Sequence, residues 1–358
     1  MAPGGTRPVP SSKLETAMNR NRRAIVLLVC VMGSATILGV LFCIRPLRPN
    51  EQYLGFSRFF AAKPVELVTL RLPAHDFYLA GKSEDSLYLG NHRKAMHVWQ
   101  VDLGLLDMTS VPIWSDRFAY EQLALRVQGD YFYVLDGVKP FIRYGRRGQW
   151  WAHELMDSAF FLQAAPTSDR GLVMLGMVNS ENALGKWQDG MTNPKWRTDL
   201  LEKQVDGFFC TYGKLHTDEA KNRVVYIYTN RNQFLVADTN LNVHYWANTI
   251  DTISRAKIRV GHLDSLTSTL ASPPLPVNVH SALDGNLLYV HSNIMAANED
   301  RSDFEQHIVI DVYDLDERGS YQYSFYIPKI SMKPFKGFLV KRKKLFALFG
   351  DELVGYGL

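Results

Sequence analysis

The sequence predicts an all-β domain over residues 66–358, preceded by a single membrane-spanning helix. Two observations lead to this fold class: a pair of short apolar runs that recurs six times along the domain, and one uninterrupted apolar segment near the N-terminus. The recurring runs are rich in Tyr, Phe, Val and Leu and alternate with Gly, Asp and Asn, which is typical of strands joined by short turns.

The N-terminal apolar segment covers residues 24–44, which read AIVLLVCVMGSATILGVLFCI without a charged side chain. A helix of this length spans a hydrocarbon layer of about 30 Å. More basic residues precede the segment than closely follow it, namely Arg7, Lys13, Arg20, Arg22 and Arg23 against Arg45 and Arg48. Because basic residues favour the cytoplasmic side, we expect the N-terminus in the cytoplasm and the β domain outside it.

A cleaved signal peptide is the alternative interpretation of this segment. The segment ends Phe42-Cys43-Ile44-Arg45-Pro46, without the small residues that mark a cleavage site. This favours an uncleaved anchor. The predicted organisation is a disordered, Pro- and Gly-rich cytoplasmic tail over residues 1–23, a transmembrane helix over 24–44, a linker over 45–65 and the β domain over 66–358.

Each repeat in the β domain contains an apolar run, a turn and a second apolar run, followed by further strands. The predicted first strands are Phe77–Gly81, Leu123–Val127, Phe160–Ala164, Phe208–Tyr212, Val279–Leu283 and Phe338–Lys341. Five repeats have a fourth strand, and the last repeat lacks one because the sequence ends at Leu358. A spare strand at Glu66–Leu72 can complete it and close the ring, which avoids exposed sheet edges. This predicts a six-bladed β-propeller, with a pair of β-sandwiches as the alternative fold.

The repeat pattern resembles the class of six-bladed propellers typified by TolB-like and NHL-like domains. The resemblance is one of pattern, because the repeats contain no regular Trp-Asp pair, no YWTD run and no regular NHL triplet. It implies the fold and names no specific family.

Polar residues open each predicted first strand and should surround one mouth of the central channel, on the face that we call the upper face. The predicted ligand-binding residues are His75, Asp76, Gln122, Ser158, Asp206, Asn278, His280 and Lys336. Polar groups that converge on a concave mouth are typical of a small-ligand site, although solvated loops give the same pattern. Two long insertions, Asp251–Pro276 and Ser292–Gln306, should lie on the same face.

The sequence offers few signs of catalysis. It contains no HExxH, GxSxG, phosphate-binding loop or dinucleotide glycine motif, and we expect no metal and no cofactor. Cys30 and Cys43 lie in the apolar segment, so Cys210 is alone in the β domain and is predicted to be a buried core residue. The net charge of +4 comes largely from the N-terminal tail, which argues against nucleic acid as a partner.

These features predict a membrane-anchored, non-enzymatic module that binds or scaffolds a protein or peptide outside the cytoplasm. The alternative is a hydrolase or lyase that uses Asp76, Asp206 and His280 at the upper mouth. A single cysteine in the domain and the lack of a glycosylation sequon there favour the periplasmic side of a bacterial inner membrane. Because the spare strand should begin on the lower face, we expect the linker to arrive there and the upper mouth to point away from the membrane.

Overall fold

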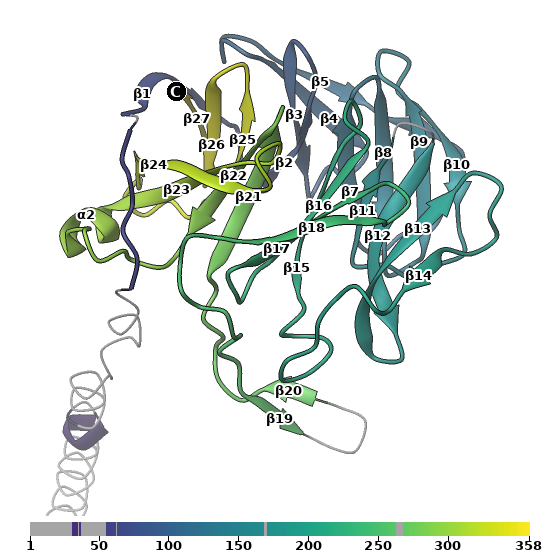
Figure 1. Cartoon of the computed structure of the whole chain (residues 1–358). Coiled ribbons are helices and arrows are strands. Elements are labelled where there is room, and N and C mark those ends of the chain that lie inside the picture. The colour runs from purple at the N-terminus through teal and green to yellow at the C-terminus, as the bar shows by residue number, and fades with distance from the viewer. Residues whose placement is uncertain (1–30, 35, 37–54, 62, 168–169, 263–267) are drawn as a thin grey trace, which may run out of the picture. The chain divides into compact units, whose positions relative to one another are not determined.

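The computed structural model describes residues 31–34, 36, 55–61, 63–167, 170–262 and 268–358 (Figure 1). The chain divides into two compact units, residues 1–52 and 53–358. In the first unit, Val31–Ser34 and Thr36 are helical, and the rest of the predicted transmembrane helix lies outside the described residues. Among the helices that are described, none combines the length and apolar character needed to cross a membrane.

Groups of four antiparallel strands make up the second unit (Figure 1), and we name each group by its inner strand, labelled first. The β2 unit comprises β2 (Phe77–Lys82), β3 (Ser86–Asn91), β4 (His97–Asp102) and β5 (Met108–Pro112). The β7 unit comprises β7 (Ala124–Gln128), β8 (Tyr131–Asp136), β9 (Phe141–Arg146) and β10 (Trp151–Met156). These two units form one nine-stranded sheet, because β2 pairs with β7 and the short β6 (Trp114–Ser115) pairs with β10.

The remaining units are separate four-stranded sheets. The β11 unit comprises β11 (Gln163–Pro166), β12 (Gly171–Val178), β13 (Glu181–Gln188) and β14 (Lys195–Arg197). The β15 unit comprises β15 (Gly213–Asp218), β16 (Arg223–Tyr228), β17 (Gln233–Asp238) and β18 (Val243–Asn248). The β21 unit comprises β21 (Asn278–Asp284), β22 (Leu287–Ser292), β23 (His307–Asp314) and β24 (Ser320–Pro328). The β25 unit comprises β25 (Phe335–Lys341), β26 (Lys344–Phe349), β27 (Glu352–Gly357) and β1 (Val65–Arg71).

Buried apolar side chains join each unit to its neighbour. Separate clusters lie between the β2 and β7 units, β7 and β11, β11 and β15, β15 and β21, β21 and β25, and β25 and β2. Strand alternation supplies these side chains, since every second residue of a strand points to the same face of its sheet. The core therefore runs round the domain and returns to its start, which is the arrangement of a β-propeller.

The predicted pairing of the spare strand with the end of the chain is confirmed. β1 lies antiparallel to β27, with Thr69 opposite Val354 and Arg71 opposite Glu352 (Figure 1). The first and last segments of the domain thus belong to one sheet, and β27 has a hydrogen-bonded neighbour on each side. This pairing removes the exposed edge that β27 would otherwise present.

Two predicted first strands are misplaced. Phe208–Tyr212 forms a turn. The inner strand of its unit is β15, which begins at Gly213, five residues after Phe208. Phe160–Leu162 precede β11, which begins at Gln163. The apolar runs misled the prediction because they lie in the links before the strands, whereas β15 itself reads GKLHTD and contains four polar residues.

The two predicted insertions carry local structure of their own. In the first, β19 (Val260–His262) pairs with β20 (Ser268–Leu270), and residues 263–267 between them lie outside the described part. The second contains α2 (Arg301–Gln306), whose N-terminus is capped by the Asp300 side chain. Ile253 from the first insertion and Ile294 from the second pack together with Phe56, so the linker joins the two insertions.

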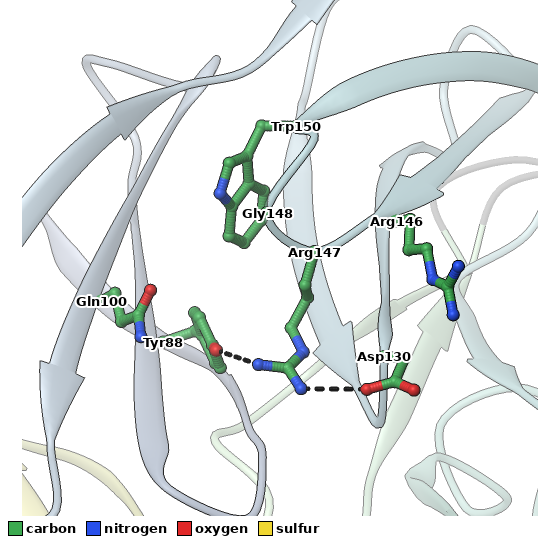
Figure 2. A pocket seen from close by; sticks show the side chains of 7 residues that line it. All are labelled: Tyr88, Gln100, Asp130, Arg146, Arg147, Gly148 and Trp150. Atoms are coloured by element: carbon green, nitrogen blue, oxygen red, sulfur yellow. Dashed lines mark hydrogen bonds and ion pairs between the residues drawn. The ribbon is translucent and has the colours of Figure 1, made fainter.

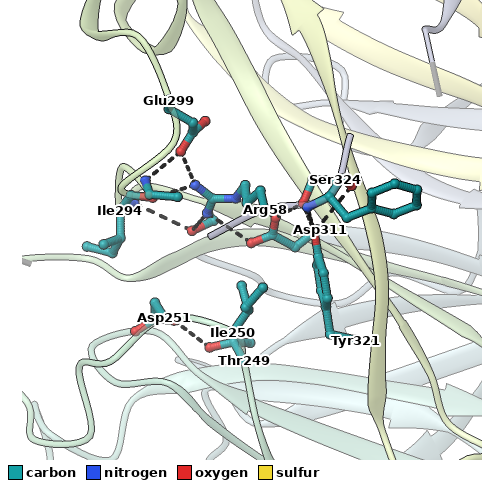
Figure 3. A network of polar contacts seen from close by, with 12 residues as sticks. Arg58, Thr249, Ile250, Asp251, Ile294, Glu299, Asp311, Tyr321 and Ser324 are labelled. Carbon is teal, nitrogen blue, oxygen red and sulfur yellow. Dashed lines mark hydrogen bonds and ion pairs between the residues drawn. The ribbon is translucent and has the colours of Figure 1, made fainter. Parts of the chain in front are cut away.

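Arg58 fixes the linker to the β21 unit (Figure 3). Its buried guanidinium donates from Nε to Asp311 Oδ1 (2.8 Å) and from Nη2 to Asp311 Oδ2 (3.0 Å). It also pairs with Glu299 and donates to the carbonyl oxygen of Ile294 (2.9 Å) and to Ser292 Oγ (2.8 Å). A buried arginine with this many partners is a strong local constraint on the chain.

The position of the linker corrects one prediction. β1 begins on the lower face as expected, but Phe56 and Arg58 lie against the two upper-face insertions, and Phe60 then bridges to Ser324 in the outer strand β24. The described linker therefore runs along the outside of the β21 unit from the upper face to the lower. This removes the reason for expecting the upper mouth to point away from the membrane.

Candidate functional site

The upper face is the side on which the inner strands begin. In an antiparallel group of four strands, the loop between the second and third strands lies on this side, and so does the link from the fourth strand to the next unit. Both insertions belong to these connections. Of the eight predicted site residues, five lie in links before inner strands, namely His75, Asp76, Gln122, Ser158 and Asp206, and three lie near the start of an inner strand, namely Asn278, His280 and Lys336.

Three of the predicted residues come together where β2 and β25 begin. Lys336 Nζ donates to the carbonyl oxygens of His75 and of Phe77 (3.1 Å). His75 Nδ1 is 3.8 Å from an oxygen of Asp351, and its side chain is exposed. Asp76 pairs with Arg93 at 3.0 Å. The cluster bridges the β2 and β25 units. The carboxylate of Asp76 and the ammonium group of Lys336 are both bonded to other groups of the protein.

Two further predicted residues lie on β21. Asn278 is 2% exposed and donates from Nδ2 to the carbonyl oxygens of Tyr228 (2.9 Å) and Arg231 (3.0 Å), so it holds the neighbouring unit in place. The ring of His280 stacks on His291, with centroids 5.7 Å apart, and meets Phe335 edge to face. Burial, together with the charge of Lys214, lowers the pKa of His280 to about 4, so its imidazole is neutral at pH 7.

The other three predicted residues each stabilise their own loop. Asp206 Oδ1 accepts from the backbone N–H groups of Phe208 and Cys210, both at 3.0 Å, and so caps the turn that replaced the predicted strand. Ser158 Oγ donates to the carbonyl oxygen of Thr192 (2.7 Å), and the backbone N–H of Gln122 donates to Asp136 (2.9 Å). Over the described residues, no hydrogen bond or ion pair joins Asp76, Asp206 and His280, so the geometry gives no support to a catalytic role for these three together.

Cys210 occupies the core position that was predicted for it. The residue is fully buried, packs with Ala256 and Ile258, and its thiol donates to the carbonyl oxygen of Asp206 (2.6 Å). It therefore ties the turn after Asp206 to the first insertion.

A set of exposed apolar side chains, which was not predicted from the sequence, lies on the upper face. All of them lie in links between units or in a loop between second and third strands: Tyr120, Val138, Phe160, Leu162, Val205, Tyr212 and Met332. Phe160 is 68% exposed and Met332 is fully exposed. On the opposite face, Leu106 is exposed in a turn, and four residues are exposed where second or fourth strands begin, namely Val65, Tyr131, Trp151 and Val243. The apolar runs around Phe160 and Tyr212 were visible in the sequence, but their assignment to strands placed them in the core.

A recess of about 350 Å³ lies on the opposite face, between the β2 and β7 units (Figure 2). Arg147 dominates it and donates to Tyr88 Oη (2.7 Å), Asp130 Oδ1 (3.1 Å) and the carbonyl oxygen of Gly129 (2.6 Å). These contacts use the donor capacity of the guanidinium within the protein. The recess therefore has less to offer a ligand than its volume suggests.

Side chains from the lower ends of the inner strands cross between units. Lys82 Nζ donates to Asp284 Oδ1 (2.9 Å) and to the carbonyl oxygen of Leu283 (2.6 Å). Gln128 Nε2 donates to Thr217 Oγ1 (3.1 Å) and to the carbonyl oxygen of Pro166 (3.3 Å). These bonds tie inner strands that are not paired with one another and fill the lower end of the axis.

Comparisons with known proteins were made at the level of families, curated sequences and solved structures. No protein-family model matches the chain, and none of the curated proteins matches it. Among solved structures, a member of the DUF4221 family from Bacteroides vulgatus is 14% identical over 82% of this chain and 97% of its own, with a TM-score of 0.49. Virginiamycin B lyase from Staphylococcus aureus, in complex with quinupristin, is 12% identical over 81% and 98%, with a TM-score of 0.47. YCF48 bound to D1 peptide is 10% identical over 84% and 99%, with a TM-score of 0.44. At this level of similarity, the fold assignment rests on the strand pairing and the cores of the chain itself.

Proposed function

We propose that this chain is a membrane-anchored, six-bladed β-propeller whose upper face binds a protein or peptide partner outside the cytoplasm. The pairing of β1 with β27 and the apolar clusters between successive units support a closed ring of six blades. The apolar, uncharged segment over residues 24–44 supports the anchor, and the basic residues before it support a cytoplasmic N-terminus.

The distribution of exposed apolar side chains carries the binding proposal. Tyr, Phe, Leu and Met side chains project from several links on the upper face, which also carries polar groups such as Lys336 and His75. Exposed apolar side chains inside a polar surround are typical of protein interfaces, in which aromatic and Met residues are enriched. The two insertions, joined through Phe56, extend the same face and enlarge the surface that a partner can contact.

Substitution of the exposed apolar residues tests this proposal. Two variants of the full chain serve as bait: the double variant Phe160→Ser/Leu162→Ser and the single variant Met332→Ser. Each variant is cross-linked to its partners in cells and then recovered by affinity purification. We expect each to reduce the yield of the specific partner at least about tenfold, because such residues dominate interface energetics. Leu106→Ser is the matched control, since Leu106 is 84% exposed in a turn of the opposite face. Partner yields that are equal for the upper-face variants and the wild type would refute the proposal.

The anchor is tested separately from the binding face. One portion of the membranes is washed with alkaline carbonate, and in a separate sample a protease is added to the outside of intact spheroplasts. We expect the chain to stay in the pellet and the β domain to be cleaved only from the extracytoplasmic side. Release of the chain by carbonate would argue against the transmembrane segment.

A further inference from the structure

Four side chains lie in a row at the lower end of the β7 unit, one each on β8, β9, β10 and β6. Tyr131 is opposite Arg146 where β8 pairs with β9, and Trp151 is opposite Trp114 where β10 pairs with β6. Arg146 is also opposite Trp151, because the register of β9 with β10 leads to this pair two residues nearer their turn. Directly opposed residues on neighbouring strands point to the same face of a sheet. We call these four residues the lower aromatic row.

The row continues the face of the sheet that packs against the β11 unit. Tyr133, two residues after Tyr131 on β8, belongs to the core between the β7 and β11 units. Strand alternation therefore directs the row to the same side as this core. At the lower end the face is open to solvent, since Trp114 is 59% exposed, Trp151 is 43% exposed and Tyr131 is 39% exposed.

The side chains of the row are not engaged with the part of the chain that the structure describes. There, no other aromatic ring and no cation stacks on its three aromatic rings, whereas the neighbouring Trp150, on the other face of the sheet, meets the ring of Phe132 at 5.0 Å. The two indole N–H groups and the guanidinium of Arg146 likewise make no hydrogen bond or ion pair with described residues. The row thus presents free ring faces together with free hydrogen-bond donors.

The described carboxylates around the row are paired with other arginines or lie at its end. The pairs are Asp130 with Arg147 at 3.1 Å, Asp189 with Arg170 at 3.3 Å and Glu154 with Arg143 at 3.5 Å. Glu219 is half-buried beside Gly129, at the inner end of the row. The row therefore offers a ligand mainly donors and apolar ring surface.

A proline-rich segment in the polyproline II conformation matches this surface in spacing. Tyr131 and Trp151 are two strands apart, or about 9.6 Å at the usual distance between strands. One turn of polyproline II contains three residues and rises about 9.3 Å, so two prolines three residues apart can lie on the two rings. The carbonyl oxygens of such a segment have no internal partner and accept from Arg146 and the indole groups. A sugar chain fits less well, because its hydroxyl groups also need acceptors.

We propose that the lower aromatic row binds a Pro-x-x-Pro segment of a peptide or protein partner. The two prolines stack on Tyr131 and Trp151, Trp114 extends the apolar surface beyond Trp151, and Arg146 donates to the backbone between the prolines. This site goes beyond the proposed function, because it lies at the other end of the strands and shares no residue with the apolar upper-face surface.

Peptide selection on the full chain in detergent tests this site. The probe is a phage-displayed library of the form x-Pro-x-x-Pro-x, in which x is any residue, and the reference is the same library with alanine in place of both prolines. We expect enrichment from the proline library alone, and saturable binding of the best synthetic peptide in fluorescence anisotropy. Trp151→Ala and Tyr131→Ser should each weaken this binding roughly tenfold or more. Trp246→Ala is the matched control, because Trp246 is 40% exposed on the outer strand β18 of another unit.

A second readout reports on the rings in the wild-type chain. With 5-fluorotryptophan incorporated, the ¹⁹F signals of Trp114 and Trp151, assigned with Trp114→Phe and Trp151→Phe, should shift on addition of the peptide, while that of Trp246 should not. The variant Phe160→Ser/Leu162→Ser should bind the peptide as the wild type does, which separates this site from the upper face. The proposal is overturned if the alanine library is enriched equally, if Trp151→Ala binds the peptide as tightly as the wild type, or if chitohexaose shifts the two signals and the peptide does not.

Discussion

Three histidines of the β domain are held neutral by their surroundings. Burial and neighbouring cations lower the pKa of His216 to about 3 and that of His280 to about 4. Burial, with smaller contributions from His280 and Lys329, lowers the pKa of His291 to about 3. All three belong to the inner part of the domain, so protonation in the folded state would place charge next to existing cations.

The stability of the domain should therefore fall in mild acid. Unfolded histidine binds a proton near pH 6.5, so each group contributes stability that is complete above pH 6.5 and is lost as the pH falls towards 4 or 3. Asp251 opposes this trend, because burial raises its pKa to about 6 and its contribution is lost as the pH rises through that value. For these three histidines and Asp251 together, the difference is two protons, or up to about 3 kcal/mol per pH unit between pH 6 and 4. Urea unfolding of the full chain at stepped pH checks this.

His216→Gln provides the control for the pH series. It removes one titrating group, so the free energy of unfolding should change less steeply with pH. The difference in slope should correspond to about one proton, or about 1.4 kcal/mol per pH unit. A free energy of unfolding that stays constant between pH 7 and pH 5 would contradict the assignment of neutral, buried histidines.

Arg58 should be among the most sensitive single positions. Burial opposes its charge, but Asp311 and Glu299 more than offset this and raise its pKa. Arg58→Met keeps the volume and leaves two buried carboxylates without a cation, so we expect a loss of about 3–5 kcal/mol. Arg197→Met is the comparison, because the pair of Arg197 with Asp199 is exposed and should contribute little. Urea unfolding measures both, and similar losses in the two variants would show that the Arg58 network does not hold the linker.

Single residues were the hardest level to predict from the sequence. The polar residues that open the inner strands were identified, but Asp206, Ser158 and Asn278 bond to nearby backbone groups instead of converging. Residue type and position cannot reveal this, because a loop of the same composition can direct a carboxylate towards either a ligand or its own N–H groups. Whether the eight residues bind a ligand stays a prediction.

At the level of elements, the closing strand β1 joins the two ends of the domain. Leu72 N–H donates to the carbonyl oxygen of Asp351 (2.7 Å), so Leu70, two residues earlier and opposite Leu353, also directs its N–H at β27. Leu70→Pro removes this donor and fixes φ in the middle of β1, so we expect a loss of about 3 kcal/mol relative to Leu70→Ala, which keeps the donor and serves as the control. The freed edge of β27 should also promote aggregation. Denaturant unfolding and light scattering measure the two effects, and equal behaviour of the two variants would show that β1 is dispensable.

Most strands could be predicted from the sequence because their apolar residues alternate with turns. The second strands β8, β16 and β26 are nearly continuous apolar runs, as expected of strands that are buried on both faces. The inner strand β15 could not be found in this manner, since it reads GKLHTD and its polar residues resemble those of a loop.

At the scale of the whole molecule, the two faces of the propeller differ. The upper face carries both insertions, the linker contact through Phe56 and the exposed apolar links, whereas the opposite face has short turns and saturated polar groups such as Arg147. An apolar cluster lies between each pair of neighbouring units, so the units hold one another in place along the chain.

Site-specific photo-cross-linking in cells tests most directly whether the upper face is the binding face. A photoreactive phenylalanine analogue is placed at position 160 or 332 of the full chain, and at position 106 on the opposite face. The account predicts a discrete cross-linked product from positions 160 and 332 and none from position 106. A product from position 106 alone, or equal products from both faces, would contradict it.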